Sequence, residues 1–331
     1  MRATTLYKIL PSVVAAILGI ALFSVVNHYR MRAMRREQYR KIQAVQRHLV
    51  LNEEVGFLWK PNQSIALSEK DRWLNIKREG IPPEPPLTTD DYGFLNNPAA
   101  IEALKTNTPD IIGLGDSFIH NGANLFFRFF KNQGYFYYNM AMHRQCPPQY
   151  NAILTRYAIK HRPKHILYGV YVNDFEETED FRQWKQSGLD WFTYHSGIWC
   201  GPPIKSKGGK EPSIAAKNRE ANLRDVLMCI LRANEICQSS GIDFTLMLIP
   251  SKDYVVSNRR SDRYETVFYD TLRKNASRAG IRVIDLRDVF VKENNPASLY
   301  WKSDGHWSYH GMDVAATVYL RALQAPRAPG Q

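Results

Sequence analysis

Residues 110–118 read Asp-Ile-Ile-Gly-Leu-Gly-Asp-Ser-Phe, a short apolar run that ends in a glycine, an acid and a serine. The run predicts a buried strand, and Gly115-Asp116-Ser117 predicts a tight turn leading into a helix. Such a turn would expose the serine hydroxyl near the first backbone N–H groups of that helix. A purely structural role for Ser117 is the alternative, because Gly-Asp-Ser is also common in turns and helix N-caps.

Short apolar runs alternate with longer amphipathic segments along the rest of the chain. Near-continuous apolar strands separated by helices are typical of a parallel sheet covered on both faces. We therefore expect an α/β fold over residues 108–325, a three-layer α/β/α sandwich with a parallel, flavodoxin-like sheet. The expected strands are 110–114, 136–140, 165–172, 244–249 and 282–286, and the expected helices are 122–132, 149–161, 218–239, 262–279 and 309–323.

Two further segments carry polar groups that acyl transfer uses. Asn173 follows the strand expected at 165–172, and sites in parallel sheets lie beyond the carboxyl ends of the strands. Asp304 and His306 are two residues apart, so in an extended or turn segment both side chains can point the same way. Asp304 could then orient the imidazole and raise its basicity toward Ser117. The alternatives are that Asn173 and Asp304-Gly305 are simple turn residues and that His306 caps the core.

His306 has three competitors for the role of the base. Only His306 has a carboxylate two residues away, whereas the competitors are His120, His143 and His310. His120 lies three residues after Ser117 and is a candidate for lining a substrate pocket.

In this order the blocks Gly115-Asp116-Ser117-Phe118, Val172-Asn173-Asp174 and Asp304-Gly305-His306-Trp307 resemble the SGNH hydrolase superfamily, the GDSL-type esterases and lipases, over roughly residues 108–323. The resemblance implies Ser117 as nucleophile, His306 as base and Asp304 as its orienting carboxylate. It also implies an oxyanion hole made by the Asn173 side chain and by the backbone N–H groups of Ser117 and Arg144.

Two departures from the family pattern affect the site. The last block has Asp-x-His-Trp spacing, which resembles membrane-associated relatives that act on cell-surface polysaccharides. The second block, residues 138–144, has Arg144 where the family has a glycine. A backbone N–H survives this change, but a position that needs glycine-only geometry would leave the oxyanion hole damaged.

The N-terminus predicts a membrane anchor. The run from Leu10 to Val26 has no charge, so we expect residues 1–29 to form one transmembrane helix. Eight of the twelve net positive charges fall within residues 1–48, which favours anionic lipid headgroups over nucleic acid as the partner of this region. The positive-inside rule would keep the rest of the chain in the cytoplasm. The family resemblance instead implies a catalytic domain outside the membrane, periplasmic or extracellular, which is our expectation.

Residues 30–107 are expected to form a basic helical stalk at 30–50, followed by an irregular Pro-rich segment that lies on the catalytic domain. The segment 175–217 is too long for a simple connection and is interpreted as an aromatic-rich insertion. Its aromatic residues could form a lid or sugar-binding platform, or could pack against residues 51–107; they include Trp184, Trp191 and Trp199.

The cysteines and histidines leave two smaller questions. Cys146 and Cys200 could pair in an oxidising compartment, although free thiols are the simpler interpretation. Metal-ligand spacings and phosphate-binding loops are not evident in the sequence, so neither a metal nor a cofactor is expected.

The sequence thus predicts a membrane-anchored serine esterase that forms an acyl-enzyme on an acylated carbohydrate or cell-surface polymer. Transfer of the acyl group to a glycan hydroxyl shares the first half-reaction. A catalytically inactive glycan-binding or scaffold protein is a further alternative, supported by Arg144. A cytoplasm-facing protein acting on lipid esters is another, supported by the basic flank.

Overall fold

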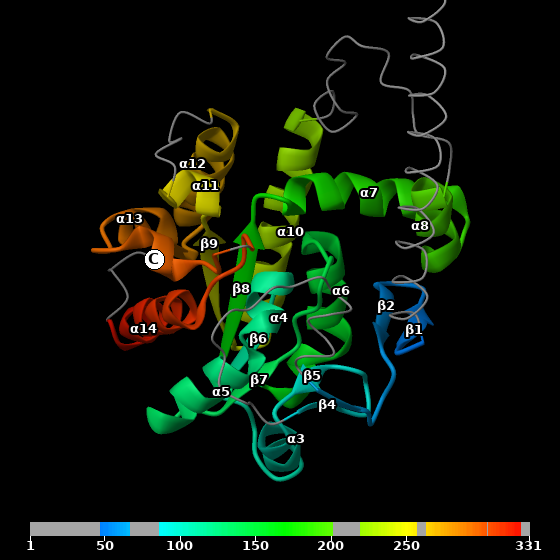
Figure 1. The fold of residues 1–331 in the computed structure, drawn as a ribbon, viewed down its shortest axis with the longest axis horizontal. Helices are drawn as coiled ribbons and strands as arrows, with labels where there is room; N and C mark the ends of the chain where they lie inside the picture. The colour runs from blue at the N-terminus through cyan, green and yellow to red at the C-terminus, as the bar shows by residue number, and fades with distance from the viewer. Residues whose placement is uncertain (1–46, 67–85, 201–218, 257–262, 303, 326–331) are drawn as a thin grey trace, which may run out of the picture.

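Five parallel strands form the central sheet of the computed structural model, which describes residues 47–66, 86–200, 219–256, 263–302 and 304–325 (Figure 1). The anchor expected at 1–29 and most of the stalk lie outside these residues. In chain order the strands are β6 (Ile111–Leu114), β7 (Tyr137–Asn139), β8 (His165–Tyr171), β9 (Asp243–Ile249) and β10 (Arg282–Asp285). All five strand predictions are confirmed to within about two residues.

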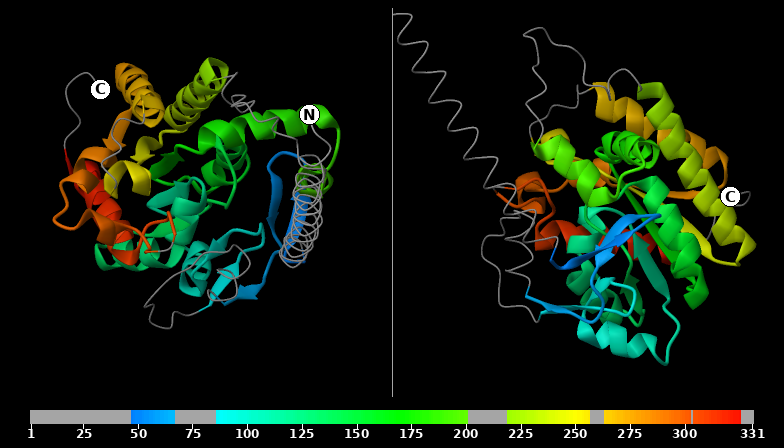
Figure 2. Two further views of the ribbon diagram at one scale, coloured as in Figure 1. Left: turned by 45° about the horizontal axis from the view of Figure 1, so that its top comes forward. Right: turned by 90° about the vertical axis from the view of Figure 1, so that its right-hand side faces the viewer.

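Helices cover both faces of the sheet, as the two views of Figure 2 show. On one face, α5 packs against α14, and on the other α10 packs against both α6 and α12. This arrangement confirms the layered α/β fold. The bounds are α5 (Ala123–Asn132), α6 (Pro147–Arg156), α10 (Arg219–Ser239), α12 (Arg263–Arg278) and α14 (Tyr309–Gln324).

The order of the strands determines where a site can form. Across the sheet the strands run β10-β9-β8-β6-β7, which is 2-1-3-4-5 when they are numbered along the chain and read from the other edge. This is the flavodoxin-like order, and its chain direction reverses between β6 and β8. Side chains that follow these two neighbouring strands therefore meet at one crevice beyond the carboxyl edge.

The described residues before the central sheet, 47–66 and 86–107, are more regular than the sequence predicted. The helix predicted at 30–50 was wrong at its C-terminal end, because Leu49 and Val50 belong to strand β1 (Leu49–Asn52). This strand pairs with β2 (Gly56–Trp59) in a hairpin. A second antiparallel sheet joins three strands of two or three residues each, and a short helix follows. These elements are β3 (Ser64–Ile65), β4 (Leu87–Thr89), β5 (Leu95–Asn96) and α3 (Pro98–Leu104).

The catalytic-domain core stabilises this N-terminal region. The Asn96 and Asn139 amides are joined through two hydrogen bonds, in which Asn96 Nδ2 donates to Asn139 O (2.9 Å) and Asn139 N donates to Asn96 Oδ1 (2.8 Å). Trp59, Phe94 and Leu95 are buried in the common core. Strands this short are stable only through such distant contacts, which explains why the local sequence did not reveal them.

Two smaller findings concern the thiols and the membrane. Cys146, Cys229 and Cys237 are free, so the pairing of Cys146 is not formed. Within the described parts of the chain, no helix is both long enough and apolar enough to span a bilayer.

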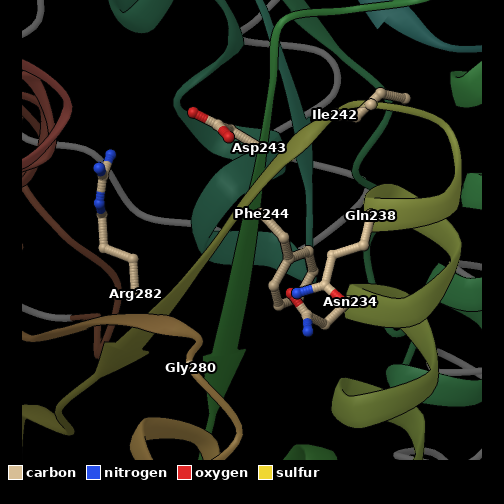
Figure 3. Close-up of a pocket in the computed structure, with 8 residues that line it drawn as sticks. Asn234, Gln238, Ile242, Asp243, Phe244, Gly280 and Arg282 are labelled. Carbon is tan, nitrogen blue, oxygen red and sulfur yellow. The ribbon is translucent and has the colours of Figure 1, made fainter. Parts of the chain in front are cut away.

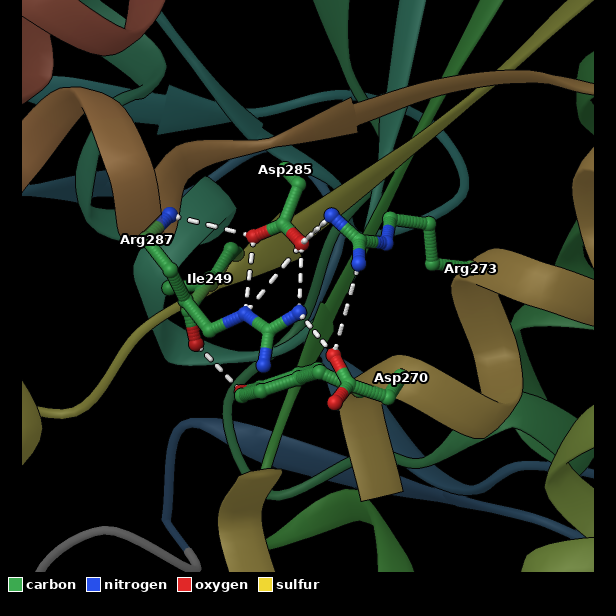
Figure 4. A network of polar contacts seen from close by, with 6 residues as sticks. Ile249, Asp270, Arg273, Asp285 and Arg287 are labelled. Carbon is green, nitrogen blue, oxygen red and sulfur yellow. Dashed lines mark hydrogen bonds and ion pairs between the residues drawn. The ribbon is translucent and has the colours of Figure 1, made fainter. Parts of the chain in front are cut away.

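A charged network closes the carboxyl end of β10 (Figure 4). The buried Arg287 guanidinium donates to Asp285 (Nε to Oδ1, 2.9 Å; Nη2 to Oδ2, 2.6 Å) and to Asp270 Oδ1 (2.8 Å). Burial alone would lower the pKa of Arg287, but the hydrogen bonds to Asp285 and Asp270 raise it. Arg273 lies 3.7 Å from both carboxylates and is half exposed.

We expect Arg287→Met to lower the free energy of unfolding by about 3 kcal/mol, because it leaves the nearly buried Asp285 without its main partner. Arg273→Met is the matched control, and its loss should stay below about 1 kcal/mol since that side chain is half exposed. Urea unfolding midpoints measure both. Equal losses for the two variants would contradict this account of the network.

Candidate active site

Glycines in the sheet seat the serine-bearing helix directly on the strand ends. Helix α4 (Ser117–Asn121) follows β6, and its Ile119 side chain lies against Gly115 and Gly169. A Cβ at Gly169 would come within 2.6 Å of Ile119 Cγ1, and one at Gly115 within 2.7 Å. Because both positions lack side chains, α4 packs close to β6 and β8. Ser117 therefore begins its helix at the crevice where the strand order reverses.

Ser117, His306 and Asp304 form one hydrogen-bonded chain. Ser117 Oγ lies 2.7 Å from His306 Nε2, and His306 Nδ1 lies 2.5 Å from Asp304 Oδ1. A carboxylate can only accept, so Nδ1 carries the proton and Nε2 presents its lone pair to the serine hydroxyl. This is the tautomer that a general base requires. The structure thus brings together three groups that the sequence separates by up to 189 residues.

The segment carrying His306 is held against the core on both sides of the imidazole. Trp307 is fully buried and bridges to Tyr300, and Trp301 N donates to His306 O (3.0 Å). The Phe118 ring packs against His306, with ring centroids 5.0 Å apart. The His306 side chain keeps about a quarter of its surface exposed.

The Asp116 carboxylate connects Asn173 to the turn that carries Ser117. Asp116 accepts from Phe118 N (3.0 Å) and caps α4, and its carboxyl group also accepts a hydrogen bond from the Asn173 side chain. Burial raises the pKa of Asp116, while the nearby His306 lowers it. The interpretation of Asp116 as a hydrogen-bonding turn residue agrees with these contacts. Asn173 is also the N-cap residue of α7 (Asp174–Ser187), although its side chain does not cap that helix.

Two further acids lie behind Asn173. Burial first, and then the charge of Asp116, raises the pKa of both Asp174 and Glu177 well above the usual range. Asp174 accepts from Tyr150 OH (2.7 Å), and Glu177 accepts from the Asn173 side chain. Sequence analysis missed Glu177, although its spacing of four residues from Asn173 on one helix could have indicated it.

The second-block segment runs alongside the serine turn. Met140 N donates to Gly113 O (2.9 Å) and Met142 N to Gly115 O (3.2 Å), which extends the pairing beyond β7. Arg144 follows in a turn and has φ of 55°. This is the left-handed region that glycine adopts freely and that costs another residue about 1–2 kcal/mol. The position thus has the backbone geometry that glycine favours, and Arg144 adopts it with an exposed side chain.

The three competing histidines have other surroundings. His120 is fully buried, and its Nδ1–H donates to Ala141 O (2.9 Å), so it does not line an open pocket as predicted. His143 is buried with its Nε2 3.0 Å from Asn121 Oδ1. His310 is exposed and lies 3.7 Å from Glu293.

Trp191 of the aromatic-rich insertion packs on the β1–β2 hairpin. The insertion contains α7 and α8 (Trp191–Cys200), and Trp191 lies directly over Gly56, where a Cβ would come within 2.4 Å of its ring. Trp191 also contacts Phe57 and Trp184 (ring centroids 5.6 and 5.0 Å). Trp184 and Trp191 are both buried, so they are core residues and do not form a sugar platform. For Trp191 the alternative expectation, packing against residues 51–107, is the one that holds. The side chain of Trp199 lies outside the described residues.

We expect Trp191→Ala to destabilise the protein by about 3 kcal/mol or more, because it removes a buried indole from a packed contact. The KM for a small ester should stay within about twofold of the wild type. Thermal unfolding and steady-state kinetics measure the two effects, and Met228→Ala on the exposed face of α10 is the control. A large rise in KM without loss of stability would restore the platform interpretation.

A cavity of about 250 Å³ lies at the opposite edge of the sheet (Figure 3). It is lined by Asp243 and Arg282, the first residues of β9 and β10, and by Asn234 and Phe244. Ser117 follows the carboxyl end of β6, so this cavity does not adjoin the triad. Among the described residues, no group of three or more His, Cys, Asp or Glu side chains could hold a metal ion.

Comparison with protein families matches residues 210–331 to the family described as SGNH hydrolase-like domain, acetyltransferase AlgX. This range includes Asp304 and His306, whereas Ser117 and Asn173 precede it. None of the curated proteins compared matches the chain.

Several solved structures are similar to this chain. A putative acylhydrolase from Bacteroides fragilis has a TM-score of 0.45 and 17% identity, covering 69% of this chain and 94% of that one. A GDSL-like lipase from Bacteroides thetaiotaomicron has a TM-score of 0.44 and 14% identity, covering 68% and 95%. A catalytic mutant of an acetylxylan esterase from Geobacillus stearothermophilus has a TM-score of 0.44 and 11% identity, covering 67% and 97%.

Proposed function

We propose that this chain is an SGNH/GDSL-type esterase or acyltransferase, that it forms an acyl-enzyme at Ser117 and that its substrate is an O-acylated carbohydrate. The observation that carries the proposal is the continuous chain from Ser117 Oγ through the imidazole of His306 to Asp304. Such a chain activates a hydroxyl that is otherwise a weak nucleophile.

The proposed reaction uses each group at a named atom. Ser117 Oγ attacks the ester carbonyl carbon while its proton passes to His306 Nε2, and Asp304 stabilises the resulting imidazolium. The carbonyl oxygen becomes an oxyanion that takes hydrogen bonds from the first N–H of α4 and from the Arg144 N–H. The Asn173 side chain, whose N–H groups donate to Asp116 and Glu177, joins them only by giving up one of those bonds. When the tetrahedral intermediate collapses, the imidazolium gives its proton to the leaving alcohol. The acyl group stays on Ser117.

An acetyl group and a carbohydrate are the proposed substrate parts. The family description names an acetyltransferase, which supports acetyl as the acyl group. The Asp-x-His-Trp spacing of Asp304–Trp307 resembles relatives that act on cell-surface polysaccharides, which supports the carbohydrate. Water or a sugar hydroxyl then attacks the acyl-enzyme, with His306 removing its proton, so hydrolysis and transfer share one site.

The fate of the acetyl group tests the proposal. The purified protein is given p-nitrophenyl acetate as donor, with and without a neutral oligosaccharide, and both free acetate and acetylated sugar are quantified by mass spectrometry. An esterase releases acetate whether or not the sugar is present, and a transferase forms acetylated sugar in competition with it. The proposed function would be rejected if the wild type formed neither free acetate nor acetylated sugar above the level of a Ser117→Ala control.

We further propose that residues 1–29 anchor the protein and that the catalytic domain faces the periplasm or cell exterior. The apolar run Leu10–Val26 and the basic residues after it support the anchor and its contact with anionic lipid. The test is protease digestion of the C-terminal domain in sealed, inside-out membrane vesicles. Protection supports the external location, and digestion supports the cytoplasmic one.

A further inference from the structure

A lysine from the end of β9 holds the loop that precedes His306. Lys252 begins α11 (Lys252–Val256), and its Nζ donates to the backbone oxygens of Trp301 (2.6 Å) and Lys302 (2.9 Å). Nζ also lies 3.4 Å from the backbone oxygen of Asp304. An ammonium group has three N–H donors, and here all three face carbonyls of one short loop.

Lys252 is itself fixed to the sheet and to α12. The preceding Ser251 donates through its N and Oγ to the buried Glu265 carboxylate of α12 (2.9 and 2.6 Å). Tyr300 OH donates to Pro250 O (2.9 Å), which joins the same turn to the residue just before the loop. The turn 250–252 therefore links the carboxyl end of β9 to the loop at two points.

We propose that Lys252 is a positioning residue that sets the place of Asp304 and His306 relative to Ser117. This inference rests on the proposed function, because it concerns the same three groups. Asp304 and His306 reach Ser117 from a loop outside the sheet, whereas Ser117 is seated on the sheet by α4. The ammonium of Lys252 ties that loop to β9, so both halves of the triad share one rigid support.

Loss of this contact acts on rate rather than on substrate binding. Without the ammonium, three carbonyls lose a charged donor and the loop can shift toward water. A displacement of about 1 Å in a catalytic group costs on the order of 100-fold in rate. Lys252 touches neither Ser117 nor the imidazole in the described structure, so a change in substrate affinity is not expected.

The test compares Lys252→Met with Lys164→Met. Lys164 Nζ forms a similar short contact with Asp110 (2.7 Å) at the opposite edge of the sheet, which makes it a matched control. For Lys252→Met we expect kcat on p-nitrophenyl acetate and the rate of fluorophosphonate labelling to fall about 10- to 100-fold. The KM should stay within about twofold, and the control should match the wild type in both constants.

A second background separates positioning from general damage. The Asp304→Asn variant already has an impaired base. Adding Lys252→Met to it should lower kcat by less than about a third of the fold-loss seen in the wild-type background, because both changes act through His306. If Lys252→Met does not fold, as judged by circular dichroism, Lys252→Gln replaces it in the same cycle.

The outcomes distinguish this inference from the proposed function. A wild type that resists labelling at Ser117 defeats both. If the wild type is labelled, three results overturn the positioning role alone. They are a Lys252→Met variant as fast as the wild type, an effect of Lys252→Met on KM only, and an undiminished loss of kcat for Lys252→Met in the Asp304→Asn background.

Discussion

Ser117→Ala is expected to abolish fluorophosphonate labelling and to reduce kcat on p-nitrophenyl acetate by about 10⁴-fold or more, since the acyl-enzyme can no longer form. The hydroxyl makes its main contact with His306, so its loss should leave the fold and its melting temperature nearly unchanged. Intact-protein mass spectrometry after probe treatment gives the labelling result directly.

Ser239→Ala is the control for this substitution. Its hydroxyl bonds to Ile236 O on the exposed end of α10, and this variant should label like the wild type. Labelling that persists in Ser117→Ala would place the nucleophile elsewhere. A wild type that never labels would favour the catalytically inactive glycan-binding protein, the alternative that Arg144 raised.

His306→Ala is expected to have an effect of similar size, a loss of about 10⁴- to 10⁶-fold in kcat. His306 Nε2 lies 2.7 Å from Ser117 Oγ, whereas the Asp116 carboxylate accepts from the same hydroxyl only at 3.4 Å. Asp304→Asn should lower kcat by a smaller factor than His306→Ala. Asp304 Oδ1 accepts from both the backbone N–H (2.8 Å) and Nδ1–H of His306, and an asparagine oxygen can keep both bonds. What asparagine loses is the negative charge that stabilises the imidazolium.

Steady-state kinetics on p-nitrophenyl acetate measure this order, with His310→Ala on the exposed start of α14 as the control histidine. The assignment of His306 would fail if its alanine variant kept a tenth of the wild-type rate. It would also fail if His310→Ala proved as damaging.

The central sheet could be predicted because its strands are marked by neighbouring residues in the sequence. The strands β6, β8 and β9 are largely apolar, buried runs, and such a run can be recognised without knowing its distant partners. The hairpin β1–β2 and the strands β3 to β5 were missed for the opposite reason. They are two to four residues long and are stabilised by contacts such as Asn96 with Asn139, which lie far apart in sequence.

The same distinction applies to the site. Residue type, spacing and the family resemblance together indicated Ser117, Asn173, Asp304 and His306. Each of these residues follows a strand or lies two residues from its partner. The sequence pattern did not indicate that Trp191 fills the space over Gly56, and it gave Lys252 no role. Both assignments depend on contacts between residues that are far apart in the sequence.

The amino-acid sequence thus determined the layered sheet and the chemical groups at its carboxyl edge. Tertiary structure decided that Ser117 Oγ and His306 Nε2 stand within a hydrogen bond of each other, and that Trp184 and Trp191 belong to the core. Strand burial follows from the local run of apolar side chains. The distance between two groups 189 residues apart instead depends on the strand order, on the glycine seat of α4 and on the packing of the last loop.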